Sequence, residues 1–428
     1  METTVALITL LVLLFLNVPI FISLIASVLL YFGIGGQLPL MIAVQRVIGG
    51  IESIPLLAVP FFVMMGVVMN YTGITRRMIK FSEVLTGHLP GGLAQVNVLL
   101  STLLGGVSGS NIADAAMQSK VLVPEMVRQG QDKGFAAAVT AASSLITPII
   151  PPGIGLIIYG FTANVSIGKM FMAGIVPGAM TCGLMMFMVH IIAKKRGYLP
   201  SRERMARPKE VFAATKEAFF ALMLPLVIIG GIRFGVFTPT EAGAIAVVAA
   251  FILGLLVYKE MKVQDVKSVM VETITTTASV MLIIGAASAF AWFLTWERIP
   301  QQVAEVVLSV VDNKYVFLLL VNVLLLIVGM FIEGNAAMLV LVPLLMPILT
   351  ALEIDPVHFG LIFIFNMAIG TLTPPMGTVM FTVCSVTGVK IKDFMRAVWP
   401  FYLLLVVCLL FITYVPAISL FLPNLIIK

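Results

Sequence analysis

The stretch SLITPIIPPGIGLIIYGF, residues 144–161, places three prolines and three glycines inside a strongly apolar part of the chain. Proline has no backbone N–H to donate, and it opens the helical carbonyl ladder one turn back. In a membrane, irregular backbone survives only where it is buried in protein or lines a cavity. The stretch therefore predicts an interrupted membrane helix whose freed carbonyl oxygens face something other than lipid.

The composition of the whole chain agrees with a membrane location. Of the 428 residues, 60% are hydrophobic and only 11% are charged, whereas soluble domains carry about 25% charged residues. Apolar runs close to the length that crosses a bilayer recur along the chain. These features predict an all-α polytopic membrane protein. The net charge of +6 comes from basic loops, which indicates orientation by the positive-inside rule rather than nucleic-acid binding.

No group of residues predicts an enzyme or a metal centre. Cys182, Cys384 and Cys408 lie in separate apolar runs, and the three histidines are scattered. No His/Glu metal motif and no Ser/Lys dyad stands out in the sequence. We therefore expect a transporter and not an enzyme. The start Met-Glu-Thr-Thr lacks a basic region, which favours a first membrane helix over a cleaved signal peptide.

The two halves of the chain repeat one pattern. PPGIGLIIYGFTANVSIGKMFMAGIVP starts at residue 151, and PPMGTVMFTVCSVTGVKIKDFMRAVWP of equal length starts at residue 374. Upstream of them, Asn111 in SGSNIADAAM aligns with Asn335 in IEGNAAMLVL at nearly the same offset. The shared order of a Gly-Asn turn, a proline and a Pro-Pro break indicates an internal repeat.

The charges predict that the two repeats are inverted. Residues 194–217 contain eight Lys or Arg and three Glu, which marks this segment as cytoplasmic. The other basic clusters can also be cytoplasmic if segment 90–127 enters and leaves on the inside. Its counterpart, 313–350, has acidic flanks and must then enter and leave on the outside. Inverted-topology repeats are typical of secondary transporters, and this arrangement puts the N-terminus outside.

Each re-entrant segment follows an arm that reads as an amphipathic surface helix. In the second arm, PQQVAEVVLSVVD, the valines recur at i, i+3, i+4, i+7 and i+8. The first arm, TGITRRMIKFSEVL at 72–85, carries apolar residues at the aligned positions. An ordinary loop helix is the alternative for both.

Each repeat then supplies a hairpin tip and an interrupted helix. The tips are GGVSGSNIAD (105–114) and IEGNAA (332–337), and the interruptions are SSLITPIIPPG (143–153) and NMAIGTLTPPMGT (366–378). A tip and a break from one repeat can together enclose a hard cation, which prefers oxygen ligands. Half-helix N-termini after each tip and break would attract an anionic substrate. The oxygen-bearing side chains of these segments are Ser108, Ser110, Asn111, Ser143, Ser144, Thr147, Asn335, Thr371, Thr373 and Thr378.

Three charged residues carry open alternatives. Glu333 is an intramembrane carboxylate, so it is a functional candidate that binds substrate hydroxyls, carries a proton or faces water. Arg298 either pairs with a substrate carboxylate or anchors the interface. Asp114, three residues after Asn111, predicts a capping box.

The motifs resemble those of the large membrane subunit of tripartite ATP-independent periplasmic (TRAP) transporters, the DctM-like family of the ion transporter superfamily. The resemblance covers essentially the whole chain, and FTPTEA with the preceding GGIRFG is its most specific part. The matching elements are GSNIADAAM (109–117), ITPIIPPGIG (146–155), FTPTEAGAIA (237–246) and GTLTPPMG (370–377).

This resemblance implies an elevator mechanism, sodium coupling, a separate small four-helix membrane subunit and a periplasmic substrate-binding protein. Many relatives read Ser where this chain has Gly153 after the first Pro-Pro pair. The implied Na⁺-binding residues are Ser108, Gly109, Asn111, Ser143, Ser144, Thr147, Gly334, Asn335, Thr371, Thr373 and Gly377. The expected substrate-binding residues are Ser110, Pro151, Pro152, Gly153, Glu333, Pro374, Pro375 and Met376, with Arg298 as a further candidate.

We therefore expect a bacterial inner-membrane protein that imports a small organic anion with Na⁺, either a sialic acid-like sugar acid or a C4-dicarboxylate. A stand-alone Na⁺/dicarboxylate symporter of the same superfamily is the alternative. The expected segments are scaffold with arm (1–88), first half of the transport domain (89–193), basic cytoplasmic linker (194–218), scaffold with arm (219–312), second half of the transport domain (313–400) and C-terminal helix (401–428).

Overall fold

The computed structural model describes residues 2–16, 18–35 and 39–426. The expected segments 1–88 and 401–428 also contain residues 1, 17, 36–38, 427 and 428, which lie outside the described residues. All regular structure in the described ranges is helical. Within these described ranges, seven helices are long and apolar enough to cross a membrane, or up to nine if each bent pair counts as one span. The predicted polytopic all-α class is therefore confirmed.

The first half of the described chain contains ten α-helices and two 3₁₀ turns. Their bounds are α1 Glu2–Phe15, α2 Ile20–Gly35, α3 Met41–Ile51, η1 Ile54–Leu57, α4 Ala58–Tyr71, α5 Ile74–Thr86, α6 Gly92–Ser108, α7 Asn111–Arg128, α8 Lys133–Ser144, η2 Thr147–Ile149, α9 Ile154–Thr162 and α10 Ile167–Arg196.

The second half of the described chain repeats this order of helices, beginning with the pair α11 and α12. Its bounds are α11 Pro208–Arg233, α12 Pro239–Ile252, the π-helical turn η3 Leu253–Val257, α13 Asp265–Trp296, α14 Ile299–Val310, α15 Lys314–Gly329, α16 Gly334–Ala351, α17 Pro356–Gly370, α18 Thr378–Thr387, α19 Ile391–Tyr414 and α20 Pro416–Ile426.

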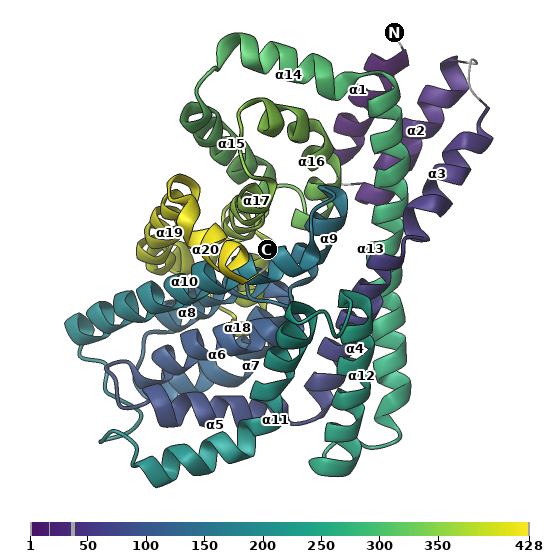
Figure 1. The fold of residues 1–428 in the computed structure, drawn as a ribbon. Helices are drawn as coiled ribbons and strands as arrows, with labels where there is room; N and C mark the ends of the chain where they lie inside the picture. The colour runs from purple at the N-terminus through teal and green to yellow at the C-terminus, as the bar shows by residue number, and fades with distance from the viewer. Residues whose placement is uncertain (1, 17, 36–38, 427–428) are drawn as a thin grey trace.

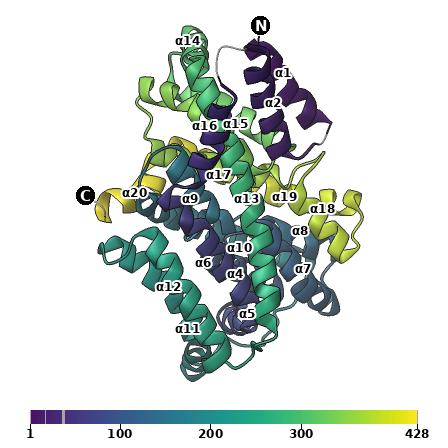
Figure 2. The same ribbon diagram turned by 90° about the vertical axis from the view of Figure 1, so that its right-hand side faces the viewer.

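One group of helices is built around the long helix α13. It packs against α2, α3 and α4, and α4 packs in turn against α12 (Figures 1 and 2). Small residues allow the close approach: a Cβ at Gly50 would lie 2.4 Å from the Cβ of Ser288, and one at Gly285 would lie 3.0 Å from the Val47 carbonyl. Close backbone packing through small residues replaces the hydrophobic driving force that is missing in lipid.

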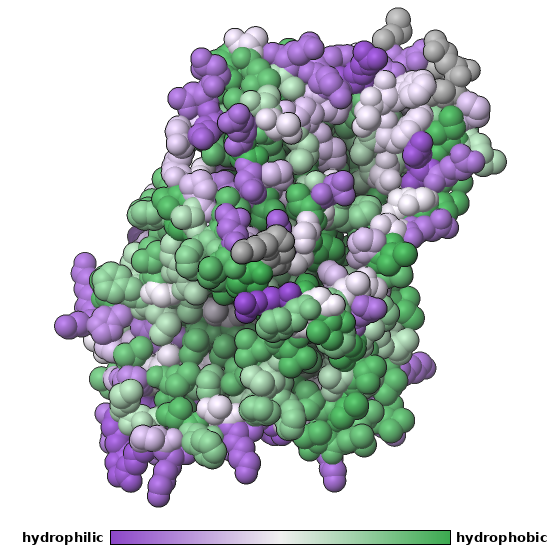
Figure 3. Space-filling model, in the orientation of Figure 1, coloured by the Kyte–Doolittle hydropathy of each residue, from purple (hydrophilic) through white to green (hydrophobic). Residues whose placement is uncertain are grey.

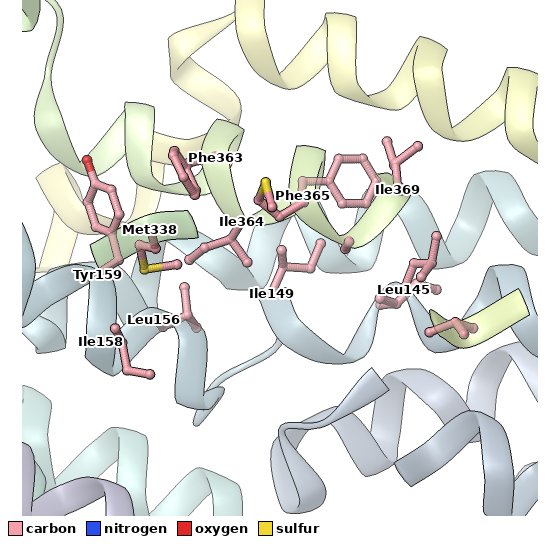
Figure 4. Packing of buried hydrophobic residues seen from close by; sticks show 14 of the residues in the cluster. Leu145, Ile149, Leu156, Ile158, Tyr159, Met338, Phe363, Ile364, Phe365 and Ile369 are labelled. Atoms are coloured by element: carbon pink, nitrogen blue, oxygen red, sulfur yellow. The ribbon is translucent and has the colours of Figure 1, made fainter. Parts of the chain in front are cut away.

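The hairpins and interrupted helices form a second group. Helix α8 packs against α6, α7 and α19, and α17 packs against α15 and α19. In the core of this group, Leu145, Ile149 and Leu156 of the first repeat and Phe365 of α17 are fully buried members of one apolar cluster (Figure 4). The two interrupted helices are thus held together by an apolar core.

The two repeats run in opposite directions, as the charges predicted. The arm α5 and the arm α14 lie at opposite ends of α13 in both ribbon views. Each arm packs on the hairpin that follows it, α5 on α6 and α14 on α16. Both predicted arms are helices. Hydrophilic side chains protrude at the end that holds α5 and the start of α11, below a broad apolar band (Figure 3).

Some helix ends differ from the expected segment boundaries. Helix α10 runs to Arg196, and α11 starts at Pro208, so both extend into the segment expected as linker, 194–218. Helix α19 starts at Ile391 and crosses the boundary expected at residue 400. The charged residues within α10 and α11 led to a linker prediction that starts before α10 ends and stops after α11 begins. A helix can continue past the bilayer wherever its polar residues reach water.

Candidate functional site

The two hairpin tips wall one cavity. Its volume is about 190 Å³, and both interrupted helices and α13 complete the wall. The polar and glycine residues that line it are Gly109, Ser110, Asn111, Gly155, Thr276, Glu333, Gly334, Asn335, Thr371 and Thr378. Two tips that enter from opposite ends of the molecule therefore meet at one place.

A second hollow of about 390 Å³ adjoins the first. Thr276, Val280, Glu333 and Asn335 line both spaces, so tip 332–337 stands between them. The remaining lining residues come from α9, α13 and α16 and are Ile158, Thr275, Ser279, Ile283 and Leu339. Together the hollows reach the size range typical of small-molecule sites.

The first tip is shaped by Gly109 and Ser110. Gly109 ends α6 in a left-handed conformation, with φ +61°, which glycine adopts without steric cost. Ser110 is the N-cap of α7 and accepts a hydrogen bond from the Ala113 N–H at 3.4 Å. Asn111 then donates from Nδ2 to Oγ1 of Thr371 at 3.2 Å. This bond ties the tip of the first repeat to the break of the second.

The capping box predicted for Asn111 and Asp114 is wrong. The cap is Ser110, one residue earlier, and Asp114 lies on the buried side of α7. Its Oδ2 accepts a hydrogen bond from Thr147 Oγ1 at 2.7 Å, which joins α7 to the first break. Spacing alone gave the wrong role because a carboxylate one turn into a helix points either back to the cap or into the core.

The second tip is capped by a carboxylate. Glu333 Oε2 accepts from the Ala336 N–H at 3.1 Å, and Oε1 accepts from Nδ2 of Asn335 at 2.8 Å. A negative charge at the N-terminus of α16 is favourable because it opposes the positive end of the helix dipole. Each carboxylate oxygen keeps a free lone pair, so Glu333 can accept further hydrogen bonds in the cavity.

Glycines let each tip reach the break of its own repeat. A Cβ at Gly370 would lie 2.5 Å from the Cα of Gly329. In the first repeat, a Cβ at Gly109 would lie 3.2 Å from the Ile154 nitrogen and 3.4 Å from the Cα of Gly153. Backbone therefore meets backbone where the first tip approaches the first break, and where the end of α15 approaches the second break.

Both predicted interruptions are present. Helix α8 ends at Ser144, a 3₁₀ turn follows, and α9 departs at an angle of 43°. Helix α17 ends at Gly370 and α18 starts at Thr378. Each gap contains a cis peptide bond, Pro151–Pro152 and Pro374–Pro375. Within the described residues, no hydrogen-bond donor meets the carbonyl oxygens of Pro151, Pro152 and Thr373.

In each gap, a glycine lies so close to backbone carbonyl oxygens that a side chain would not fit. A Cβ at Gly153 would lie 2.6 Å from the oxygen of Pro148. A Cβ at the equivalent Gly377 would lie 2.8 Å from the oxygen of Thr371 and 2.9 Å from that of Thr373. A serine at position 153 would therefore require the backbone of the first break to shift.

One predicted residue, Ser143, belongs to a buried polar network and lines neither hollow. Ser101 Oγ contacts Ser143 Oγ and Oε1 of Gln118, both at 2.9 Å. Asn97 Nδ2 donates to Thr140 Oγ1 at 2.6 Å in the same cluster. The sequence analysis missed Asn97, Ser101, Gln118 and Thr140, and the only available signal was polar residues inside apolar helices.

The other predicted residues are placed as follows. Ser144 donates to the Ala141 carbonyl at 2.8 Å, and Thr373 donates to that of Ile369 at 3.0 Å, so both hydroxyls serve their own helices. Ser108 is half-buried, and its Oγ accepts a weak hydrogen bond from the Ser110 N–H. Seven further predicted residues line neither hollow. Three of them are buried: Pro151, Pro152 and Gly153. The other four are Pro374, Pro375, Met376 and Gly377, of which Pro375 and Met376 are exposed.

Arg298 lies far from this cavity. It starts α14 at the end of α13, 22 residues beyond Thr276, which is about 30 Å along a helix. Neighbouring Glu297 accepts hydrogen bonds from Thr3 and Tyr31, which fixes this end of α13 to the N-terminal helices. The structure therefore does not bring Arg298 together with the other predicted substrate residues.

The sequence analysis also missed the hydroxyl groups of α13. Thr275, Thr276 and Ser279 line the hollows from the side opposite tip 332–337. The run ETITTTAS, residues 272–279, was the signal, because such a polar run is unusual inside a long apolar helix.

A larger hollow of about 610 Å³ lies elsewhere, where the ends of α9, α11 and α12 meet η1. None of the predicted tip and break residues lines it. We place the site at the smaller cavity because both hairpin tips contribute polar groups there.

Comparisons with known proteins agree with this architecture. A family model described as "Tripartite ATP-independent periplasmic transporter, DctM component" matches residues 7–418. The sialic acid TRAP transporter large permease protein SiaM of Vibrio cholerae is 42% identical over 415 residues, 96% of each chain. The C4-dicarboxylate TRAP transporter large permease protein DctM of Pseudomonas aeruginosa is 39% identical over 373 residues, 87% of each chain.

A solved structure shares the fold at low sequence identity. The YdaH transporter of Alcanivorax borkumensis superposes with a TM-score of 0.63 and 15% identity, covering 89% of this chain and 88% of the other. The apolar spans and the family match together identify a multi-pass protein of the bacterial inner membrane. This chain belongs to the DctM component family of the tripartite ATP-independent periplasmic transporters, the large permeases.

Proposed function

We propose that this chain carries a sialic acid-like sugar acid into the cell together with Na⁺. A periplasmic binding protein delivers the substrate, and a separate small four-helix membrane subunit completes the transporter. The observation that carries the proposal is the single cavity lined by Ser110 and Asn111 from one tip and by Glu333 and Asn335 from the other.

The chemistry of the cavity favours an anion with one carboxylate and several hydroxyls. Helices α7 and α16 both begin at the cavity. The end of α16 is already capped by the Glu333 carboxylate, whereas α7 is capped by the neutral Ser110, so the positive end of α7 attracts the substrate carboxylate. Glu333 repels a second carboxylate but accepts hydrogen bonds from hydroxyls. Sialic acid is the named substrate of the Vibrio cholerae relative. A C4-dicarboxylate, named for the Pseudomonas aeruginosa relative, would bring its second charge close to Glu333.

The Na⁺ ions are proposed to bind where each tip meets its break. The residues of the first site are Ser108, Gly109 and Asn111 with the break that follows Ser143. Those of the second are Gly334 and Asn335 with Thr371, Thr373 and Gly377. Support comes from carbonyl oxygens in both breaks that lack donors within the described residues, since a hard cation prefers such oxygen ligands. The hairpins and interrupted helices then move as one body against α4, α12 and α13 in an elevator cycle.

Reconstitution of the chain with its small subunit and binding protein tests this function. We expect uptake of labelled sialic acid into liposomes under an inward Na⁺ gradient, and little uptake when choline replaces Na⁺. Succinate uptake without sialic acid uptake would overturn the proposed substrate. Uptake that needs no binding protein would favour the stand-alone symporter.

The same assay tests the sodium residues. Asn335→Ala removes an oxygen-bearing group of the second Na⁺ site, and Ser110→Ala removes one next to the first Na⁺ site, so the Na⁺ concentration for half-maximal uptake should rise while the thermal unfolding temperature changes little. Thr382→Val is a matched control, because its hydroxyl is bonded to the Thr378 carbonyl and lies outside the cavity. A wild-type Na⁺ response in both folded tip variants would contradict the site assignment.

A further inference from the structure

We propose that Thr276 on α13 is a specificity-determining residue whose hydroxyl binds a hydroxyl group of the substrate. It acts from the wall opposite Glu333, so the substrate is recognised by both groups of helices and not by the tips and breaks alone. This inference rests on the proposed function and names one further contact for the same substrate.

The position of Thr276 is the first observation. Thr276 and Val280 of α13 line both hollows, together with Glu333 and Asn335 of the second tip. Thr276, Val280 and Ile283 follow the i, i+4, i+7 spacing of one helix face, so this face of α13 is the wall that looks toward the tip. Thr276 is exposed there, although it lies in the middle of a helix that is long enough to cross the membrane.

Hydrogen bonding separates Thr276 from the other two hydroxyl groups of α13 that line the hollows. Thr275 donates its hydroxyl to the Val271 carbonyl at 2.8 Å, and Ser279 donates to the Thr275 carbonyl at 2.9 Å. Such bonds within the helix occupy the only proton of each hydroxyl. The Thr276 hydroxyl has no hydrogen-bond partner in the part of the chain that the structure describes. Its proton and lone pairs are therefore available to a ligand.

The opposite wall determines which ligand group fits. Glu333 is an acceptor when ionised, so a group between it and Thr276 must donate toward Glu333. A substrate hydroxyl does this and at the same time accepts a hydrogen bond from Thr276. The carboxylate of an unsubstituted dicarboxylate offers no donor and would be repelled. The pair Thr276 and Glu333 thus selects hydroxyl-bearing anions over plain dicarboxylates.

Thr276→Val tests the assignment in the reconstituted three-component transporter. Valine has the shape of threonine without the hydroxyl, so the helix is preserved. Loss of one neutral hydrogen bond should raise the KM for sialic acid by roughly three- to tenfold, with the maximal rate and the unfolding temperature close to wild type. Thr276→Ser should restore the KM. Thr295→Val is the control, because Thr295 is on the same helix, outside both hollows, and bonded to the Ala291 carbonyl.

The outcomes separate this inference from the proposed function. If the wild type transports sialic acid and Thr276→Val has an unchanged KM, the role of Thr276 is overturned while the proposed function stands. If Thr276→Val and Thr295→Val raise the KM equally, the effect is structural and the inference also fails. If the wild type transports succinate and not sialic acid, the proposed function itself is overturned.

Discussion

Single glycines decide how closely the backbone segments of the site approach one another. Gly329 and Gly370 are in direct backbone contact where α15 passes the end of α17. Inside the second break, Gly377 likewise leaves no room for a side chain, because it lies against the carbonyl oxygens of Thr371 and Thr373. The oxygen-rich geometry of the second break thus depends on positions where no side chain fits.

Gly370→Ala should disturb this contact. The added Cβ would lie 2.5 Å from the Gly329 backbone, and backbone cannot move aside as a side chain does. Overpacking of this kind typically costs about 1–3 kcal/mol, so the unfolding temperature in detergent should fall and Na⁺-driven uptake should fall with it. Gly183→Ala is the matched control, since nothing lies within 4 Å of its added Cβ. Equal unfolding temperatures for the two variants would show that the contact is not needed.

The sequence predicted the residues of the tips but not the partners of buried polar groups. Asn111 and Asn335 were found because glycine-rich turns and the repeat pointed to them, and both line the cavity. Asp114 was assigned to a cap because its partner Thr147 lies 33 residues away, in a different helix segment. Local spacing reveals hydrogen bonds within a turn, whereas bonds between helices depend on packing that the sequence does not display.

At the scale of elements, each repeat has a polar clasp, by which we mean a side-chain hydrogen bond between the first helix of its hairpin and its interrupted helix. In the first repeat Asn97 of α6 donates to Thr140 of α8 at 2.6 Å. In the second, Nδ2 of Asn366 on α17 donates to Oδ1 of Asn322 on α15, also at 2.6 Å. The Pro-Pro pairs in the sequence predicted where the helices break. The clasps, which hold α6 against α8 and α15 against α17, are seen only in the structure.

Double-mutant cycles should show a similar coupling in both clasps. Within the bilayer such hydrogen bonds contribute about 1 kcal/mol each. We therefore expect coupling energies of this size for Asn97→Ala with Thr140→Ala and for Asn322→Ala with Asn366→Ala, measured by reversible unfolding in mixed micelles. The control pair Asn97→Ala with Asn366→Ala makes no such bond and should be additive. Additivity in all three cycles would mean that the clasps do not stabilise the hairpins.

For the molecule as a whole, inversion of the repeats explains why the cavity exists. Each tip reaches only part of the way through the structure, and its own side chain, Ser110 or Glu333, caps the helix that follows it. The opposite directions of the repeats bring both tips to one place, where Asn111 bonds to Thr371 across the two halves. Charge and repeat order predicted this relation from the sequence. The size of the cavity and the face that α13 presents to it depended on the packing of all the helices.

Labelling from one side of the membrane should reveal the inverted arms and the orientation of the chain. The native cysteines are buried, so they should react little with an impermeant maleimide and can remain in place. Arg76 on α5 and Glu305 on α14 are both exposed, and each can be changed to cysteine. An impermeant maleimide added to cells with a permeabilised outer membrane should label Glu305→Cys and leave Arg76→Cys unlabelled until the inner membrane is broken. Loss of the Arg76 ion pair with Glu260 should not matter, because exposed pairs contribute about 0–1 kcal/mol. Labelling of both positions from the periplasm would rule out inversion, and the reverse pattern would place the N-terminus inside.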